Sequence, residues 1–143
     1  MNYEKLDIGD FEQLVELERL YKHSVGEADL DGSQIARLKD AVQKNQIEFF
    51  AGKENNGKII AMCSVSVVFS TFSCAFSGIF EDFFILEEYR QKGIARELTG
   101  FVFDCMRQRN INAVWVGCAD ADLKMYESLG FSMRLGNLLT WHA

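Results

Sequence analysis

The feature that most limits how this chain can fold is an uncharged segment from residue 59 to residue 80, IIAMCSVSVVFSTFSCAFSGIF. It is long enough to cross a bilayer as a helix, for which about 20 apolar residues are needed. However, serine or threonine interrupts it repeatedly, and Ser64-Val65-Ser66-Val67 alternates polar and apolar residues as a strand does. The segment therefore predicts a β-hairpin that turns near Ser70 to Ser73, and no membrane partner is expected.

Composition limits the class of protein. The chain has 143 residues, of which 48% are hydrophobic, so we expect a single domain over residues 1–143. Its net charge of −6 argues against nucleic acid as a partner, because phosphate binding requires a basic surface. The cysteines form no CxxC pair and the two histidines lie near opposite ends, so no metal site is expected. The first residues contain no apolar stretch of the signal-peptide kind, which favours the cytoplasm.

Shorter elements are expected before the hairpin. Apolar residues at helical spacing indicate helices, and Asn55-Asn56-Gly57 favours a tight turn that leads into the hairpin. The expected elements are a strand near Tyr3 and Leu6, a helix over residues 11 to 21, a second helix capped by Asp31 or Ser33, and a strand from Glu48 to Lys53.

After the hairpin, the pattern changes to alternating strands and helices. A strand followed by an amphipathic helix and an apolar strand predicts a βαβ crossover with parallel pairing. The expected elements are a strand over residues 78 to 86, a helix with an apolar stripe from Ile94 to Met106, a strand from Ala113 to Val116, a helix from Asp122 to Leu129 that Asp120 caps and Gly130 ends, and two final strands joined by Gly136-Asn137.

The segment EEYRQKGIARELTG, residues 87 to 100, places basic residues around a glycine where the longest helical pattern begins. A turn through Gly93 into a helix exposes unpaired main-chain N–H groups at the positive end of the helix dipole. Phosphate groups bind at such ends, and Arg90, Lys92 and Arg96 add positive charge. The spacings GxxxxGK[ST] and GxGxxG are absent, so neither a nucleoside triphosphate nor NAD is expected. The alternative is a plain turn with solvated basic residues.

Two segments carry a family resemblance. Residues 90 to 95, RQKGIA, resemble the [QR]-x-x-G-x-[GA] acetyl-CoA signature of the GNAT N-acetyltransferase superfamily, and residues 125 to 131, MYESLGF, are similar to the LYEKLGF segment of that family. The resemblance implies an α/β fold whose mixed, mostly antiparallel sheet is flanked by helices and has a fourth and a fifth strand that run parallel and splay apart. It implies acetyl-CoA as the cosubstrate. The implied cofactor-binding residues are Phe84, Ile85, Leu86, Arg90, Gln91, Lys92, Gly93, Ile94, Ala95 and Arg96.

The resemblance also implies the chemistry. In an N-acetyltransferase a primary amine attacks the thioester directly within a ternary complex, with an oxyanion-stabilising N–H near Ile85. Tyr126 is then the expected general acid, since a phenol is protonated at neutral pH, although its spacing also suits a core residue. Glu81 is the expected proton acceptor for the incoming ammonium, because strand alternation directs Asp82 to the opposite face.

Several alternatives remain open at this point. Ala119 stands where many relatives have an asparagine, and Glu87 where many have a proline, so a non-catalytic acetyl-CoA-binding sensor is the second hypothesis. An interaction domain without a cofactor is the third. Cys118 offers a covalent acyl-enzyme route, but no histidine lies near it in sequence. The acceptor is an amine-bearing small molecule, a peptide or a protein, and Trp141 is compatible with either a homodimer face or the core.

Overall fold

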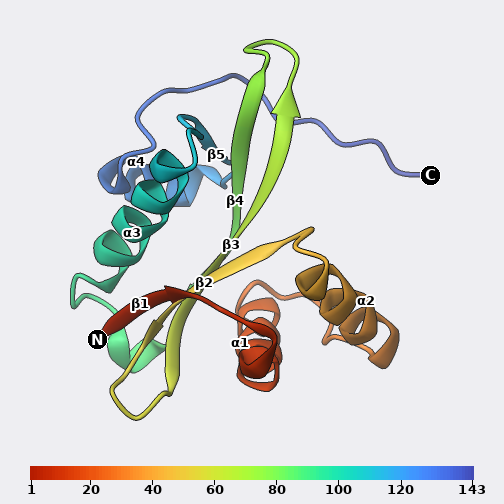
Figure 1. Ribbon diagram of the computed structural model, residues 1–143, viewed down its shortest axis with the longest axis vertical. Coiled ribbons are helices and arrows are strands. Elements are labelled where there is room, and N and C mark those ends of the chain that lie inside the picture. The colour runs from red at the N-terminus through yellow and green to blue at the C-terminus, as the bar shows by residue number, and fades with distance from the viewer.

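The computed structural model describes residues 1–143 and contains one five-stranded sheet of order β1-β2-β3-β4-β5 (Figure 1). Neighbouring strands pair antiparallel, except for β4 and β5, which are parallel. This mixed sheet confirms the expected fold class. The strands are β1 (Asn2–Lys5), β2 (Glu48–Lys53), β3 (Ile59–Ser70), β4 (Ala75–Ile85) and β5 (Val114–Val116).

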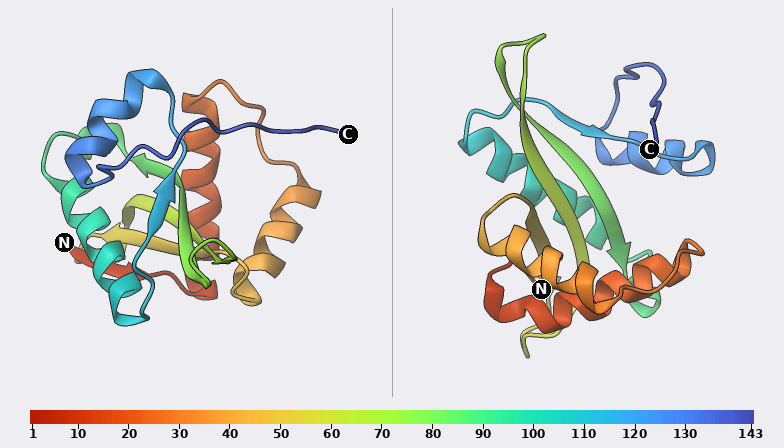
Figure 2. Two further views of the ribbon diagram at one scale, coloured as in Figure 1. Left: turned by 90° about the horizontal axis from the view of Figure 1, so that it is seen from above. Right: turned by 90° about the vertical axis from the view of Figure 1, so that its right-hand side faces the viewer.

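Helices cover both faces of the sheet. Helices α1 (Phe11–Ser24) and α2 (Gly32–Gln43) lie on one side, and α3 (Ile94–Gln108) and α4 (Leu123–Leu129) lie on the other (Figures 1 and 2). Three short 3-10 helices, η1 (Ile8–Asp10), η2 (Glu87–Tyr89) and η3 (Asp120–Asp122), lead into or out of longer elements. Asp31, one of the two expected caps of α2, accepts a hydrogen bond from the N–H of Gln34 at 2.7 Å.

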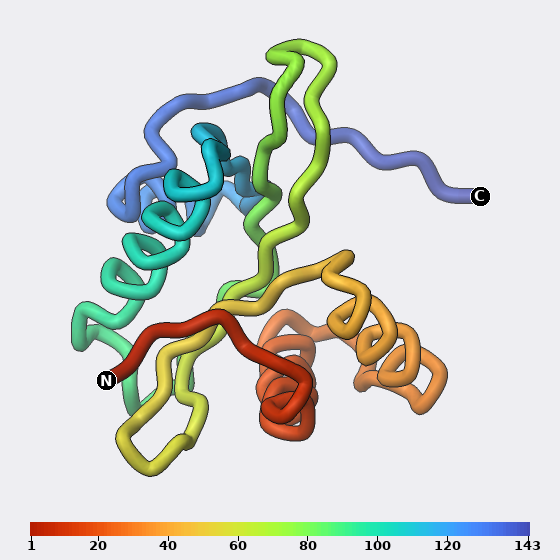
Figure 3. Tube along the Cα trace, viewed as in Figure 1, coloured from red at the N-terminus to blue at the C-terminus, as the bar shows by residue number.

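The uncharged segment forms the β3–β4 hairpin. Its turn occupies residues 71 to 74, as predicted, and β4 begins a few residues earlier than the pattern indicated. No helix of the protein has both the length and the apolar character that a bilayer crossing demands. The hairpin projects beyond the rest of the molecule (Figure 3), and Phe69, Phe72 and Phe76 are exposed near its tip.

Strand alternation divides the core into two clusters. Toward α3, strand residues such as Phe50, Cys63 and Phe80 pack on a buried helical stripe. That stripe consists of Ile94, Leu98, Val102 and Met106. Toward α1, the cluster includes Phe49, Met62 and Phe84 from the strands, together with Phe11, Leu14 and Leu17 from the helix. The sheet is therefore buried on both faces, and each face positions one helix of the site described below.

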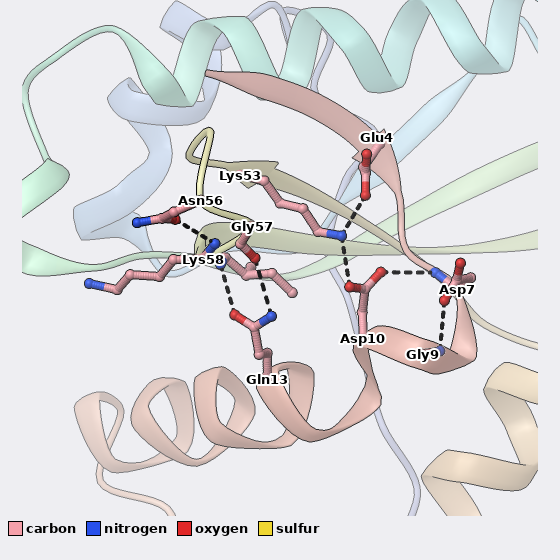
Figure 4. Close-up of polar contacts among 10 residues, drawn as sticks. Glu4, Asp7, Gly9, Asp10, Gln13, Lys53, Asn56, Gly57 and Lys58 are labelled. Atoms are coloured by element: carbon pink, nitrogen blue, oxygen red, sulfur yellow. Dashed lines mark hydrogen bonds and ion pairs between the residues drawn. The ribbon is translucent and has the colours of Figure 1, made fainter.

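Side-chain contacts fix the start of α1 against the sheet (Figure 4). Lys53 of β2 forms ion pairs with Glu4 and with Asp10, at 2.5 and 2.7 Å. Gln13 of α1 accepts a hydrogen bond from the N–H of Ile59 at 3.0 Å and donates one to a carbonyl of the β2–β3 turn at 3.2 Å. These contacts hold α1 over β3 and β4.

Two sequence predictions near the C-terminus are wrong. Asp120 makes no capping hydrogen bond, because it lies inside η3 and not before it. The chain from residue 132 onward forms no strand, although Gly136 does adopt a positive φ of 102°. Since β5 has only three residues, it offers a very short edge for a further strand. Phe131, by contrast, packs on Phe80 as expected, at 5.3 Å between ring centroids.

Candidate functional site

A β-bulge interrupts β4 at Asp82. Asp82 and Phe83 separate Glu81 from Phe84 on β4, whereas only one residue separates the partners of Glu81 and Phe84 on β3. Asp82 has a φ of 51°, which aspartate tolerates better than most residues. The prediction that Asp82 faces away from Glu81 is wrong. The extra residue turns its carboxylate to the face of Ser64, whose Oγ donates to it at 3.5 Å and which is the β3 partner of Glu81.

Beyond the bulge, β4 has an open edge. The parallel ladder joins β4 to β5 only from Gly78 to Phe80, so residues 81 to 85 have no neighbour on that side. The N–H of Leu86 donates to the carbonyl of Ile60 on β3 at 3.0 Å. Because successive residues of a strand direct their main-chain groups to opposite edges, the N–H of Ile85 points to the open edge. Strands β4 and β5 therefore splay apart beyond Phe80, as expected.

The loop after η2 leaves a row of free hydrogen-bond donors. None of the five main-chain N–H groups from Gln91 to Ala95 donates to another protein atom. Gln91 has a φ of 60° and Gly93 a φ of 85°, and these left-handed conformations point consecutive amides outward at the start of α3. A Cβ atom at Gly93 would meet nothing within 4 Å, so the positive φ, and not crowding, is the reason for a glycine.

Three basic side chains surround this row of amides, and none forms an ion pair with a carboxylate of the protein. Arg90 donates from Nε to the carbonyl of Ile85 at 2.9 Å, and its guanidinium lies 5.6 Å from the ring centroid of Phe84. Lys92 Nζ lies 5.3 Å from the ring of Tyr89. Arg96 is exposed on the first turn of α3. Free amides and unpaired cations are the groups that favour an anion at the start of a helix.

The other residues expected at the cofactor contribute differently. The side chain of Phe84 is buried toward α1, 6.3 Å from the ring of Tyr21, so it is not available to a ligand. Leu86 is half-buried between the two core clusters. Ile94 is buried as the first residue of the α3 stripe, which leaves its amide as its only polar contribution.

Tyr126 lies where β4 and β5 separate. Its ring contacts Phe80, Phe83 and Phe131, with centroid distances of 6.5, 6.3 and 5.7 Å. Burial raises the pKa of Tyr126 to about 12, and the neighbouring Tyr21 adds to this effect. Its hydroxyl has no hydrogen-bond partner in the protein. The position combines a packed ring, as the core interpretation expected, with a free hydroxyl that is protonated at neutral pH, as the general-acid interpretation requires.

One residue of this region was missed in the sequence. Glu18 of α1 is only 5% exposed, and its Oε1 has no hydrogen-bond partner. Burial raises the pKa of Glu18 to about 8, and the charge of Asp82 acts in the same direction. A signal was present, because Glu18 continues the buried stripe of Phe11, Leu14 and Val15 at helical spacing. A carboxyl group at a core position of an amphipathic helix departs from the usual apolar pattern, so it suggests a functional role.

The fold is that of known acetyltransferases. A predicted acetyltransferase from Clostridium acetobutylicum, solved with acetyl-CoA, superposes with a TM-score of 0.80 at 20% identity, covering 97% of this chain and 94% of that one. An aminoglycoside acetyltransferase from an uncultured soil metagenomic sample, solved with trehalose, superposes with a TM-score of 0.85 at 16% identity, covering 99% of this chain and 95% of that one. Glucosamine-6-phosphate N-acetyltransferase from Arabidopsis thaliana superposes with a TM-score of 0.77 at 19% identity, covering 99% of this chain and 98% of that one.

The sequence itself assigns the family. Residues 11–131 match the sequence model of the Acetyltransferase (GNAT) family. The chain therefore belongs to the GNAT acetyltransferase family, as its glycine loop and its MYESLGF segment predicted. Acetyl-CoA is the acyl donor of that family. No match was found among curated proteins.

Proposed function

We propose that the protein is an N-acetyltransferase that transfers the acetyl group of acetyl-CoA to a primary amine by direct attack within a ternary complex. The observation that carries this proposal is the row of free amides from Gln91 to Ala95 at the start of α3. These amides, with Lys92 and Arg96, suit the diphosphate of coenzyme A. Hydrogen bonds to a charged group contribute about 1.5 to 3 kcal/mol each.

The open edge of β4 suits the rest of the cosubstrate. The pantetheine arm is proposed to lie along Phe84, Ile85 and Leu86, on the side that a further strand would take. Arg90 braces this edge through its hydrogen bond to Ile85. The N–H of Ile85 is the proposed oxyanion donor, since it lies on the open edge and has no strand to pair with.

Tyr126 is the proposed general acid. Its pKa of about 12 keeps the phenol protonated, but a thiol has a pKa of about 8.5, so complete transfer to a free thiolate would be unfavourable. We therefore assign most of its effect to a hydrogen bond that stabilises the departing sulfur. The Tyr126→Phe variant is expected to lower kcat about 100-fold, at the low end for general acids, with the Kd of acetyl-CoA unchanged. Stopped-flow rates and calorimetry separate the two quantities, and wild-type turnover would remove Tyr126 from the mechanism.

The ammonium of the acceptor must lose a proton before attack, and Glu81 is the first proposed proton acceptor. It is exposed at the beginning of the open edge. The Glu81→Gln variant tests this role through the pH profile of kcat/KM, whose acidic limb should move or disappear. A pH profile identical to that of the wild type would require another acceptor.

The acceptor is proposed to be an amine-bearing small molecule or a peptide or protein amine. Two of the structural neighbours are named for amine-bearing acceptors, an aminoglycoside and glucosamine 6-phosphate, which supports the small-molecule alternative. Residues 1–143 are proposed to act as one domain in the cytoplasm, with self-association into a homodimer through exposed apolar residues near the C-terminus.

Calorimetric titration with acetyl-CoA, followed by a screen of primary amines for release of free coenzyme A, tests the proposal. We expect saturable binding to one site per chain and thiol release with at least one amine. Binding without release over a broad panel would favour the sensor hypothesis, which the missing side chain at Ala119 already suggests. No binding at high micromolar acetyl-CoA would contradict both hypotheses.

A further inference from the structure

The buried, unpartnered carboxyl of Glu18 has no structural explanation within the protein. Glu18 lies on the sheet-facing side of α1 and is 5% exposed, yet it forms no ion pair and its Oε1 accepts no hydrogen bond. Buried polar atoms are almost always paired, and an unpaired one is a liability for folding. The other buried acid of the protein shows the contrast, since Glu48 accepts from Lys5 at 2.6 Å and from Arg109 at 2.8 Å.

The surroundings of Glu18 are strongly acidic. Asp82, turned toward α1 by the bulge, has its pKa raised by burial and by the charge of Glu81, and it accepts only a long 3.5 Å contact from Ser64 Oγ. The groups that face this region are Glu18, Tyr21 and Lys22 of α1, Ser64 of β3, Glu81 and Asp82 of β4, Asp122 of η3 and Tyr126 of α4. Lys22 is their one cation, and it lies beyond ion-pair distance of every carboxylate.

We propose that Glu18 and Asp82 form a carboxyl pair that binds the ammonium group of a cationic acceptor and takes its proton. This inference rests on the proposed acetyltransferase function and deepens it, because it selects the substrate class and moves the proton acceptor from Glu81 to the buried pair. An ammonium carries three N–H donors and a positive charge, and it therefore supplies what the unpaired Glu18 Oε1 lacks. No cluster of three or more potential metal-ligand side chains occurs in the protein.

The location suits the reaction. Asp82 lies three residues before Ile85 on the same strand, and the ring of its neighbour Phe83 lies 6.3 Å from the ring of Tyr126. An ordinary glutamate has a pKa of about 4.3 and an alkylammonium one of about 10.4, which is a poor match for proton transfer. The pKa of Glu18, about 8, lies much nearer to that of the amine.

The proton balance is complete with these groups. The ammonium gives one proton to the carboxyl pair and becomes a neutral amine. The amine nitrogen then forms a bond to the thioester carbonyl carbon, the carbon–sulfur bond breaks, and the nitrogen loses its second proton. The proton lost by the nitrogen passes to the thiolate, which Tyr126 stabilises by a hydrogen bond as coenzyme A leaves. The pair keeps the proton that it took from the ammonium, which replaces the one released to solvent when the cation bound.

The same charges select among amines. The carboxyl groups of Glu18 and Asp82, with the charge of Glu81 nearby and Lys22 as the one cation, favour an acceptor that carries positive charge and disfavour one that carries phosphate. We therefore expect a small dication such as 1,4-diaminobutane to bind, and glucosamine 6-phosphate to bind at least tenfold more weakly.

The test measures protons and not turnover. Calorimetric titration of the full chain with 1,4-diaminobutane at pH 7, in phosphate and in Tris, gives the protons released on binding from the difference in heat. The wild type should release about one proton per cation, because Glu18 is protonated before binding and ionised after it. Glu18→Gln and Asp82→Asn should release almost none and should bind the diamine at least tenfold more weakly.

Two further variants make the result specific. Glu16→Gln removes one exposed acid from the same helix outside the cluster and should match the wild type. Glu81→Gln should keep the proton release if the pair is the acceptor. The proposal is overturned if Glu18→Gln releases as many protons as the wild type, if only Glu81→Gln loses the release, or if the wild type does not bind the diamine at millimolar concentration. Acetyl-CoA titrations of the same samples report separately on the proposed function, since a failure there leaves the cation result standing.

Discussion

Glu18 makes stability depend on pH in the direction opposite to that of a paired acid. The pKa of Glu18 is about 8 in the folded protein and near 4.5 in the unfolded chain, so between these values the folded state holds a proton that the unfolded state has lost. The free energy of unfolding therefore falls as pH rises through this window. Glu18→Gln has no such dependence, and it should become more stable than the wild type by about 2 to 4 kcal/mol as pH rises from 5 to 8.5.

Urea denaturation at the two pH values measures this difference, with Glu16→Gln as the control for removing one charge from α1. The free energy of unfolding falls with rising pH only if the Glu18 carboxyl is buried and unpaired, as it is in the structure. A stability difference between Glu18→Gln and the wild type that is the same at pH 5 and pH 8.5 would mean that Glu18 titrates normally.

Individual residues differ in how far the sequence could locate them. The positions of Gly93 before α3 and of Tyr126 in α4 were predicted because short local patterns surround them. The orientation of Asp82 was predicted wrongly, since strand alternation holds only while the ladder is regular and the bulge adds one residue. Glu18 was overlooked although it occupies a stripe position of α1, because the helical periodicity was traced through apolar residues alone.

At the scale of elements, the loop before α3 depends on the conformation of one glycine. Gly93 has a φ of 85° and open space around its missing Cβ, so Gly93→Ala adds backbone strain without a clash. We expect a loss of about 1 kcal/mol in stability and weaker binding of acetyl-CoA, because relaxation of φ redirects the amides of Gln91 to Ala95. Gly100→Ala is the matched control. Gly100 lies inside α3 with nothing within 4 Å of its Cβ position, so this variant should gain about 0.5 to 1 kcal/mol.

Denaturation midpoints and calorimetric Kd values for the two alanine variants test the assignment. If both variants bound acetyl-CoA equally well, the row of amides would not be the phosphate site. Most element boundaries were predictable, since β2 and the stripe of α3 follow simple periodicities. The two strands predicted after residue 131 do not form. A strand must pair with a neighbouring edge, and the sequence alone does not show that β5 has only three residues.

At the scale of the whole molecule, the C-terminal segment leaves an unusual amount of apolar surface in solvent. Its apolar residues Met133, Leu135, Leu138, Leu139 and Trp141 are 68 to 89% exposed. In Figure 1 the segment crosses the β3–β4 hairpin, and its end then extends away from the rest of the molecule. A monomer seldom exposes so many large apolar side chains together. We therefore expect the full chain to self-associate at micromolar concentration, with this segment at the contact between copies.

Sedimentation equilibrium of the full chain and of a Leu138→Ser, Trp141→Ser double variant measures the effect. The double variant should be monomeric, and its urea midpoint should not depend on protein concentration, whereas that of the wild type should rise with concentration. Neither side chain is buried in the chain itself, so the isolated fold should be retained. Phe72→Ser at the hairpin tip, where the side chain is fully exposed, removes a comparable apolar group at a different place and should leave association intact. If Phe72→Ser dissociated the protein instead, the contact would lie at the hairpin, and a wild type that stayed monomeric at every concentration would rule out both surfaces.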